Sequence, residues 1–140
     1  MLRVFVDSDV VISSLISSSG AAYLLLNEID DLNLSVYTVS NQELQEVVTR
    51  LHLSHEKLKS LIDTRFITAQ LKKSIEEIKE EFSKYVLDID DAHIVAGAKE
   101  TKAQFLISYN TKHFKADKLK EDFNIILVTP ANFIQYLRSQ

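Results

Sequence analysis

Short apolar segments alternate along this chain with longer segments of helical pattern. Runs rich in β-branched and aromatic residues, typical of buried strands, occur at residues 3–6, 34–39, 104–108 and 124–128. At least one segment of helical or polar character separates each run from the next. Strands that are separated by helices pair in parallel through right-handed crossovers. The sequence therefore predicts an α/β fold, a three-layer α/β/α sandwich with a central, mostly parallel sheet.

The intervening segments show the spacing of helices. Leu44, Val48 and Leu51 recur at helical spacing after Ser40, which we interpret as the N-cap of that helix. Helices are predicted at residues 10–16, 21–29, 41–51, 54–63, 71–86, 92–100 and 131–137. Residues 66–69 fit either a strand or a coil. The length of 140 residues is usual for one domain, so we assign residues 1–140 to a single domain.

Glycine and cysteine are scarce, which excludes several kinds of binding site. The chain has two glycines, Gly20 and Gly97, whereas loops that cradle nucleotide phosphates need several for close backbone approach. It has no cysteine, so disulfides and thiolate metal sites are excluded and a reducing compartment is favoured. Its apolar runs are far shorter than the roughly 20 residues of a membrane span. We therefore expect a cytoplasmic protein with no membrane association.

Acidic and amide side chains occur at four separated places in the chain. Asp7 ends the first strand, with Asp9 two residues later, and Asn110 follows the strand at 104–108. Glu46 lies about two turns into the helix after the second strand, and Asp91 opens the helix at 92–100. Ligands of parallel sheets collect at the carboxyl ends of the strands, near the point where the strand order reverses. The fold therefore predicts that these side chains share one edge of the sheet.

Three aspartates crowd the start of the helix at 92–100, although one aspartate suffices as a helix cap. Asp91 directly precedes a run of small residues that can approach the sheet closely. We expect Asp91 to point into the cleft, and Asp88 and Asp90 to cap the helix or face solvent.

Four motifs in order resemble the PIN domain, a metal-dependent nuclease family that includes the VapC-type toxins of toxin–antitoxin pairs. The motifs are VFVDSDVVIS around Asp7, SNQELQE from Ser40 to Glu46, DAHIVAGA from Asp91 and SYN from Ser108 to Asn110. The ending VTPANFIQYL is similar to the closing strand and helix of that family. Two positions differ from the usual pattern: Asp9 stands where asparagine is frequent, and Asn110 where many members have aspartate.

The resemblance implies a PIN-like fold and an endoribonuclease that cuts single-stranded RNA as the toxin of a toxin–antitoxin pair. It also implies an antitoxin protein as partner, and Asp7, Glu46, Asp91 and Asn110 as catalytic residues. Residues 53–85 correspond to the variable helical region of the family. We expect the chain to form a homodimer.

Converging carboxylates call for a cation. Carboxylates about 4 Å apart repel each other by roughly 4 kcal/mol at an effective dielectric constant near 20. Oxygen ligands select Mg²⁺ or Mn²⁺, and such a metal activates water and neutralises a leaving oxygen. We therefore expect Mg²⁺ or Mn²⁺ as cofactor, with Asp7, Glu46 and Asp91 as ligands. Secondary candidates are Asp9, Asp88, Asp90 and Ser108.

A lysine-rich stretch follows the last acidic motif. The net charge of −4 argues against a general nucleic-acid coat but allows a local basic track. Lys112 and Lys115 are the candidate substrate-binding residues, with a solvated surface as the alternative. His93, within the small-residue helix, is interpreted as a packing residue.

Two other functions remain open at this stage. The segment VFVDSDVV also resembles the first motif of haloacid-dehalogenase-type phosphatases, in which Asp7 would be the nucleophile and Asp9 its acid/base partner. The later motifs of that family are missing. The third hypothesis is a non-catalytic PIN-like scaffold that binds RNA or a protein, which the neutral side chain of Asn110 makes plausible.

Overall fold

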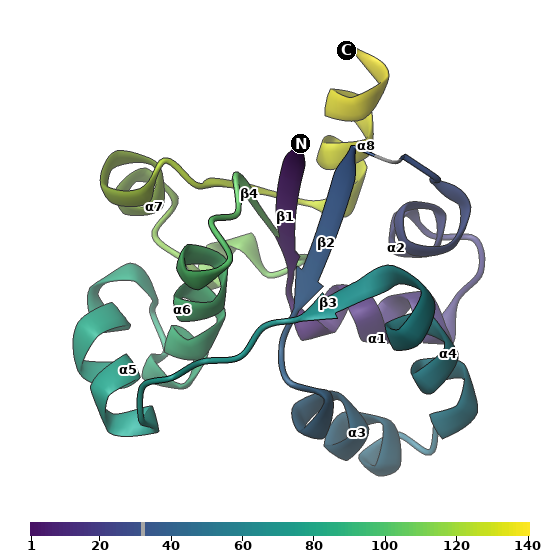
Figure 1. The fold of residues 1–140 in the computed structure, drawn as a ribbon, viewed down its shortest axis with the longest axis horizontal. Helices are drawn as coiled ribbons and strands as arrows, with labels where there is room; N and C mark the ends of the chain where they lie inside the picture. The colour runs from purple at the N-terminus through teal and green to yellow at the C-terminus, as the bar shows by residue number, and fades with distance from the viewer. Residues whose placement is uncertain (32) are drawn as a thin grey trace.

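Five parallel strands form one sheet in the order β3-β2-β1-β4-β5 in the computed structural model, which describes residues 1–31 and 33–140 (Figure 1). The strands are β1 (Leu2–Val6), β2 (Leu34–Thr38), β3 (Phe66–Thr68), β4 (Phe105–Ile107) and β5 (Ile126–Val128). All four pairings are parallel. The α/β class with a parallel sheet is thus confirmed, and the ambiguous segment 66–69 supplies the edge strand β3.

Helices cover both faces of this sheet. They are α1 (Ser8–Ile16), α2 (Ala21–Tyr23, continued by a π-helix at Leu24–Glu28), α3 (Asn41–Arg50), α4 (His55–Arg65), α5 (Ile75–Phe82), α6 (Ala92–Glu100), α7 (Ala116–Phe123) and α8 (Pro130–Arg138). Figure 1 shows α5, α6 and α7 on one side of the strands and α1 to α4 on the other. The three-layer arrangement follows from the crossovers, because each parallel pairing sends the chain over a face of the sheet.

Side-chain caps set the start of most of these helices. Ser40, Ser54, Ser74 and Thr129 precede α3, α4, α5 and α8, and each accepts a hydrogen bond from a backbone N–H in the first turn. Ser74 and Glu77 form a reciprocal capping box. That cap shortens the helix predicted at 71–86, which begins at Ile75 and leaves residues 71–74 as a connection.

Helix α7 is an element that hydrophobic periodicity does not predict. It presents only Leu119 and Phe123 as large apolar side chains, one turn apart, among charged residues. Leu119 is fully buried, and Asn124 ends the helix in the left-handed conformation, with φ of 57°. Tertiary packing of these two side chains therefore stabilises a helix that the sequence pattern leaves as loop.

The small residues of α6 let that helix approach the sheet closely. A Cβ atom at Gly97 would lie 2.5 Å from Cζ of Phe5 on β1, closer than side chains tolerate. Ala92, Ala96 and Ala98 are also buried on this helix. The close approach brings the N-terminus of α6 to the carboxyl end of β1.

Among the described residues, no single helix is long and apolar enough to cross a membrane. Ser8–Ile16 and Ala21–Glu28 reach that length and hydropathy only together, with a bend of 102° between them.

Candidate active site

The carboxyl ends of β1 and β4 meet at the point where the strand order reverses. The chain runs from β1 outward to β2 and β3, and then returns to place β4 on the other side of β1. Asp7 directly follows β1, and its backbone N–H donates to the carbonyl of Ile107 on β4 at 2.9 Å. Ser108 follows β4 and is fully buried. This switch point is where parallel sheets bind ligands.

Ser108 connects two carboxylates at this point. Its Oγ lies 3.0 Å from Oδ2 of Asp7 and 3.2 Å from Oδ2 of Asp9. The same Oγ accepts the backbone N–H of Asn110 at 3.0 Å. Since a hydroxyl carries a single hydrogen, it cannot donate fully to both carboxylates at once. Two acids are therefore held together by one shared donor.

Only one of the two carboxylate oxygens of Asp9 has hydrogen-bond partners in the described part of the chain. Its Oδ2 also accepts the backbone N–H of Tyr109 at 3.1 Å and the side-chain amide of Asn110 at 3.0 Å. Its Oδ1 is buried and has no hydrogen-bond partner in the described part of the chain. A buried carboxylate oxygen without a partner is costly, so this atom is available to take up a proton or to bind a cation.

Burial makes the acids of this cluster weak. Asp7 is only 9 % exposed, and burial, followed by the charge of Asp9, raises its pKa to about 7. Burial also raises the pKa of Asp9, against the hydrogen bond from Ser108. Oδ1 of Asp7 accepts the backbone N–H of Ser8 at 2.7 Å, so Asp7 also serves as the N-cap of α1. The cluster holds more negative charge than its own donors compensate.

The three aspartates before α6 differ in their surroundings. Asp88 accepts the backbone N–H of Asp90 at 2.9 Å and caps the 3₁₀ turn Ile89–Asp91. Asp90 is exposed and pairs with Lys79 at 3.3 Å. Asp91 is less exposed, lies 3.6 Å from Nδ1 of His113 and contributes to the raised pKa of Asp7. Burial, followed by the charge of Asp88, raises the pKa of Asp91 itself. Asp91 is thus the one of the three that is electrostatically coupled to Asp7.

The structure does not bring Glu46 to these side chains. Glu46 is exposed on α3, where its carboxylate lies 3.4 Å from Nε2 of Gln42 on the same helix. Glu43, one turn earlier on the same helix, is partly buried, and its Oε2 lies 3.0 Å from Nε2 of His93. Sequence reasoning missed Glu43 because helical periodicity alone places both glutamates near the same face.

Both ring nitrogens of His93 face hydrogen-bond acceptors beside the acidic cluster. Its Nδ1 lies 2.9 Å from the backbone oxygen of Asp90, and its Nε2 faces the carboxylate of Glu43. Both partners accept hydrogen bonds, so both ring nitrogens act as donors. Burial lowers the pKa of His93, but the hydrogen bond and the charge of Glu43 outweigh burial, and the net shift is upward. His93 therefore links α3 to α6 by an ion pair.

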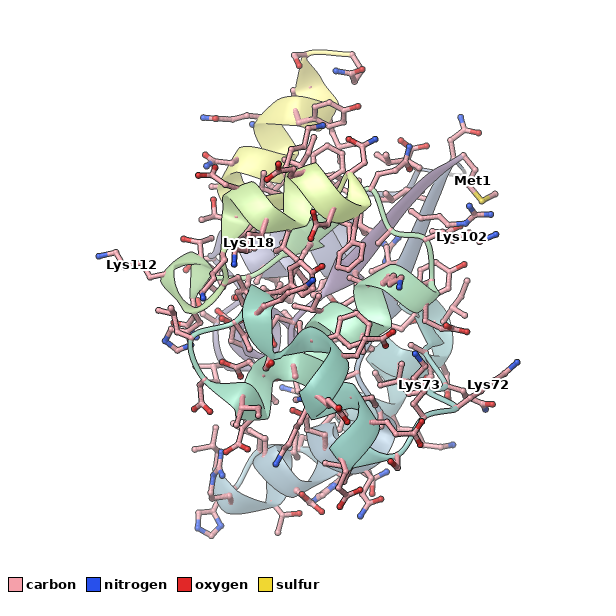
Figure 2. All side chains as sticks on the ribbon, turned by 90° about the vertical axis from the view of Figure 1, so that its left-hand side faces the viewer. Met1, Lys72, Lys73, Lys102, Lys112 and Lys118 are labelled. Carbon is pink, nitrogen blue, oxygen red and sulfur yellow. The ribbon has the colours of Figure 1, made fainter. Side chains whose placement is uncertain are left out.

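The candidate substrate-binding lysines lie outside this cluster. Lys112 is exposed in the 3₁₀ turn Thr111–His113, and Figure 2 shows its side chain extending away from the body of the molecule. Lys115 is exposed at the N-cap of α7. Both follow Asn110 within five residues, so they flank the cluster without contacting its carboxylates.

The acidic residues suit a hard divalent cation in their chemistry. Within residues 1–31 and 33–140, no three Asp, Glu or His side chains already lie close enough to hold one metal ion. Mg²⁺ does not need such a cage, since it is usually bound through one or two carboxylates and completed by water and substrate phosphate. Oδ1 of Asp9 has no hydrogen-bond partner, and burial raises the pKa of the neighbouring Asp7. Both features fit a cation that is held by one or two carboxylates.

The fold and a comparison with known proteins together identify the family of this chain. The sheet order and the acidic switch point define a parallel α/β domain with an acidic cluster. The PIN domain family model matches residues 3–112, and the chain belongs to this family. No curated protein matches the chain.

Solved structures share the fold at low sequence identity. The chain is similar to VapBC2 from Rickettsia felis, with a TM-score of 0.60 and 18% identity. The VapBC2 structure was solved with a bound DNA fragment from the VapBC2 promoter. That alignment covers 91% of this chain and 98% of the other. It is also similar to FitAB bound to an IR36 DNA fragment, with a TM-score of 0.55, 14% identity and coverage of 91% and 94%. These similarities support the PIN-like fold.

Proposed function

We propose that this chain is a Mg²⁺- or Mn²⁺-dependent endoribonuclease that hydrolyses single-stranded RNA. The observation that carries the proposal is the pair of Asp7 and Asp9, joined by Ser108 at the switch point with one buried oxygen unpartnered. PIN domains are in general nucleases, so the family agrees with this chemistry. It favours a nuclease over the phosphatase in which Asp7 would be the nucleophile.

The residues of the cluster have distinct proposed tasks. Asp7 and Asp9 would hold the cation, with Asp91 at the mouth as a further oxygen donor. Ser108 positions both carboxylates, and Asn110 fixes Asp9 through its amide nitrogen while its amide oxygen stays available to orient water. A divalent cation bound there supplies a water of lowered pKa and charge to neutralise the leaving oxygen. Hydrolysis adds the oxygen of water to phosphorus, breaks one P–O bond and returns a proton to the leaving oxygen.

Glu43 takes the place that we expected for Glu46. It reaches the cluster through His93, which is electrostatically coupled to Asp7. We propose that Glu43 and His93 position the N-terminus of α6, and with it Asp91, against the end of β1. Lys112 and Lys115 would attract the RNA backbone, because their charges flank an otherwise acidic site.

We also propose a toxin role with an antitoxin protein as partner, and a homodimer as the toxin's own assembly. The support is the structural similarity to VapBC2 and FitAB, both of which are described as complexes with DNA. Co-expression of this chain with the protein encoded beside it, followed by co-purification, tests the partner. Light scattering of the purified chain tests the dimer.

Cleavage of single-stranded RNA with Mg²⁺, with Mn²⁺ and with EDTA tests the nuclease. Asp7→Asn and Asp9→Asn should abolish turnover, and Asp63→Asn is the matched control, because Asp63 is exposed on α4, where it pairs with Lys59. Cleavage that survives EDTA, or equal rates for Asp7→Asn and the unmodified protein, would show that this acidic site does not cut the RNA and would leave the scaffold hypothesis in place of the nuclease.

A further inference from the structure

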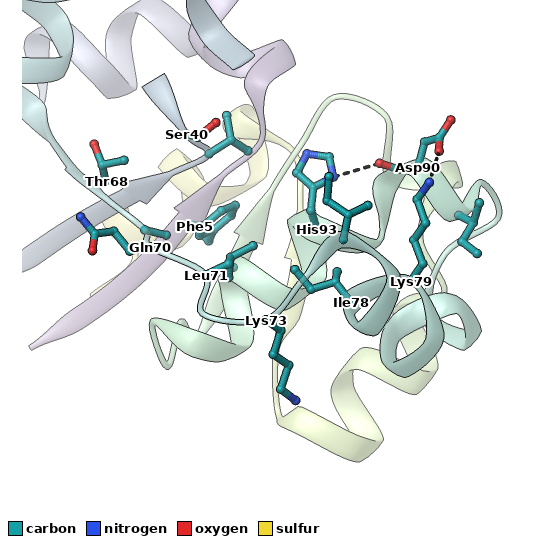
Figure 3. Close-up of a pocket in the computed structure, with 15 residues that line it drawn as sticks. Phe5, Ser40, Thr68, Gln70, Leu71, Lys73, Ile78, Lys79, Asp90 and His93 are labelled. Atoms are coloured by element: carbon teal, nitrogen blue, oxygen red, sulfur yellow. Dashed lines mark hydrogen bonds and ion pairs between the residues drawn. The ribbon is translucent and has the colours of Figure 1, made fainter. Parts of the chain in front are cut away.

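A groove of about 800 Å³ lies beside the acidic cluster, between the ends of β2 and β3 and helices α5 and α6. The segment 69–74, which connects β3 to α5, forms one wall, and α5 and the start of α6 form the other (Figures 1 and 3). The volume is within the roughly 300–1,000 Å³ of sites that bind small molecules. The size alone allows a mononucleotide-sized ligand.

Two residues that line the groove lie next to the proposed cleavage site. His93 lines it and also pairs with Glu43, while Asp90, another lining residue, directly precedes Asp91. Figure 3 shows His93 and Asp90 side by side at one end of the groove. A strand of RNA with its phosphate at Asp7 and Asp91 therefore has this groove as a neighbouring space for a base.

The walls combine apolar surface with hydrogen-bonding groups. Leu71, Ile78 and Ile89 form apolar sides above the buried ring of Phe5, and Ile89 is 47 % exposed. Figure 3 shows Thr68 and Gln70 on the opposite side from Ile78 and Lys79. Thr68 and Gln70 are both exposed, and the hydroxyl of Thr68 and the amide of Gln70 can donate and accept hydrogen bonds. Apolar sides with a few polar groups suit a flat base that is read along its edge.

Two lysines lie at the rim of the groove, each paired with a carboxylate. Lys73 pairs with Glu81 at 2.6 Å and Lys79 with Asp90 at 3.3 Å. All four side chains of these ion pairs are more than a third exposed. Exposed pairs contribute little to stability, so either lysine can exchange its partner for a phosphate at small cost. Two lysines that can exchange their partners, together with an apolar floor, match a nucleotide better than an uncharged apolar segment of a protein.

We propose that this groove binds one unpaired base next to the scissile phosphodiester and sets the sequence preference of cleavage, with Gln70 and Thr68 reading the base. This proposal rests on the nuclease function proposed above and names the part of the substrate that is recognised. Lys73 and Lys79 contact the adjoining phosphate.

Binding of nucleoside 5′-monophosphates, followed by backbone amide shifts in NMR spectra, tests the groove without any need for cleavage. At least one of AMP, GMP, CMP and UMP should shift the amides of residues 68–71 saturably, and ribose 5-phosphate should not reproduce those shifts. Gln70→Ala should weaken that binding by roughly tenfold, the effect of about 1.4 kcal/mol. Gln135→Ala, on the exposed face of α8, is the matched control and should leave binding unchanged.

Sequencing of the ends produced from a random single-stranded RNA library provides the second arm. The unmodified protein should show a preference at one position beside the cut, and Gln70→Ala and Thr68→Ala should flatten it while cleavage continues. Equal shifts with ribose 5-phosphate, or a preference that both variants leave unchanged, would overturn the groove proposal even if the protein cuts RNA. If the protein cuts no RNA, the nuclease proposal fails, and base-dependent shifts still decide whether the groove binds a base. Shifts produced by a protein partner alone would assign the groove to that partner and also overturn the proposal.

Discussion

Ser108 donates a 3.0 Å hydrogen bond to the carboxylate of Asp7, although the two residues are 101 positions apart in the chain. The bond spans the boundary between β4 and β1, the two strands on either side of the reversal in strand order. Since the same hydroxyl faces Asp9 at 3.2 Å, the stability of this sheet edge is tied to the charge of the two acids.

Removal of the shared hydroxyl should destabilise the protein. Ser108→Ala removes one hydrogen-bond donor from each carboxylate and leaves the backbone N–H of Asn110 without its acceptor, so we expect a loss of about 1–3 kcal/mol in the free energy of unfolding. Urea unfolding in EDTA at pH 8 measures it. Ser14→Ala is the control: Ser14 is also buried, but its hydroxyl bonds only to the carbonyl of Val11 in its own helix, and we expect a smaller loss. Equal losses would mean that the bridge stabilises the protein no more than the single hydrogen bond of Ser14 does.

The stability of the metal-free protein should fall as the pH rises. The pKa of Asp7 is raised from 3.8 to about 7, so the folded protein keeps a proton that the unfolded chain releases between these values. The free energy of unfolding therefore decreases from about pH 4 to pH 7, by up to about 4 kcal/mol from this residue. Asp7→Asn should remove this dependence and be the more stable protein at pH 8.

Urea titrations of both proteins from pH 4 to pH 8 in EDTA make that comparison, with Asp63→Asn, an exposed position on α4, as the control. The difference between the two curves gives the contribution of Asp7 together with its coupling to Asp9, because titrating groups that do not interact with Asp7 cancel. A difference that stays constant across this range would show that burial does not weaken the acidity of Asp7.

A divalent cation should stabilise the folded protein. Binding at 100 times the dissociation constant adds about 2.7 kcal/mol to the free energy of unfolding. We expect Mn²⁺ or Mg²⁺ to raise the melting temperature, and Asp9→Asn to abolish the increase, since it replaces the carboxylate whose Oδ1 has no partner. Sodium chloride at the same ionic strength separates specific binding from screening. Calcium chloride tests whether the site distinguishes among divalent cations. An unchanged increase in Asp9→Asn would place the cation elsewhere.

The two glutamates of α3 should differ in their effect on cleavage. Glu43→Gln weakens the ion pair with His93 that holds α3 against α6, and loss of such a positioning contact typically costs roughly 10- to 100-fold in activity. Glu46→Gln changes an exposed side chain and should retain activity within about twofold. Initial rates at saturating Mg²⁺ or Mn²⁺ compare them, with circular dichroism to confirm folding. The reverse ranking would restore Glu46 to the site.

The lysines after Asn110 should act on RNA affinity and leave the chemical step alone. Replacement of Lys112 and Lys115 by alanine removes two exposed charges beside the cluster, so binding should weaken and the salt dependence flatten by about 0.7 per lost phosphate contact. Both replacements are made in the Asp91→Asn variant, so that the RNA is not cut during the measurement. Affinity for one single-stranded RNA is then measured across salt concentrations. An unchanged salt slope would leave the two lysines as ordinary solvated residues.

Local patterns were enough to predict most of the elements. Alternation of apolar strands with helical segments predicted a parallel α/β sheet because parallel strands require crossovers. Ser40 was predicted as a helix cap because its hydroxyl acts on backbone within the same turn. Asp7 was predicted at a strand end because the apolar run of the first strand stops there. These features depend on residues only a few positions apart.

Other features depend on contacts between distant segments. Helix α7 exists because Leu119 and Phe123 pack into a site formed by the rest of the fold, and two apolar residues make too short a pattern to predict. The ranking of Glu43 above Glu46 depends on how α3 is rotated against α6, which brings His93 to one of them. The groove beside His93 depends on the path of residues 69–74.

The sequence by itself determined which side chains stand at the ends of strands and helices, because propensity and capping act over one or two turns. Only the tertiary structure decided which of those ends meet. Strand order placed Ser108 between Asp7 and Asp9, and burial at that junction raised the pKa of Asp7. Desolvation and charge coupling depend on distances in space, and positions along the chain do not determine those distances until the sheet has formed.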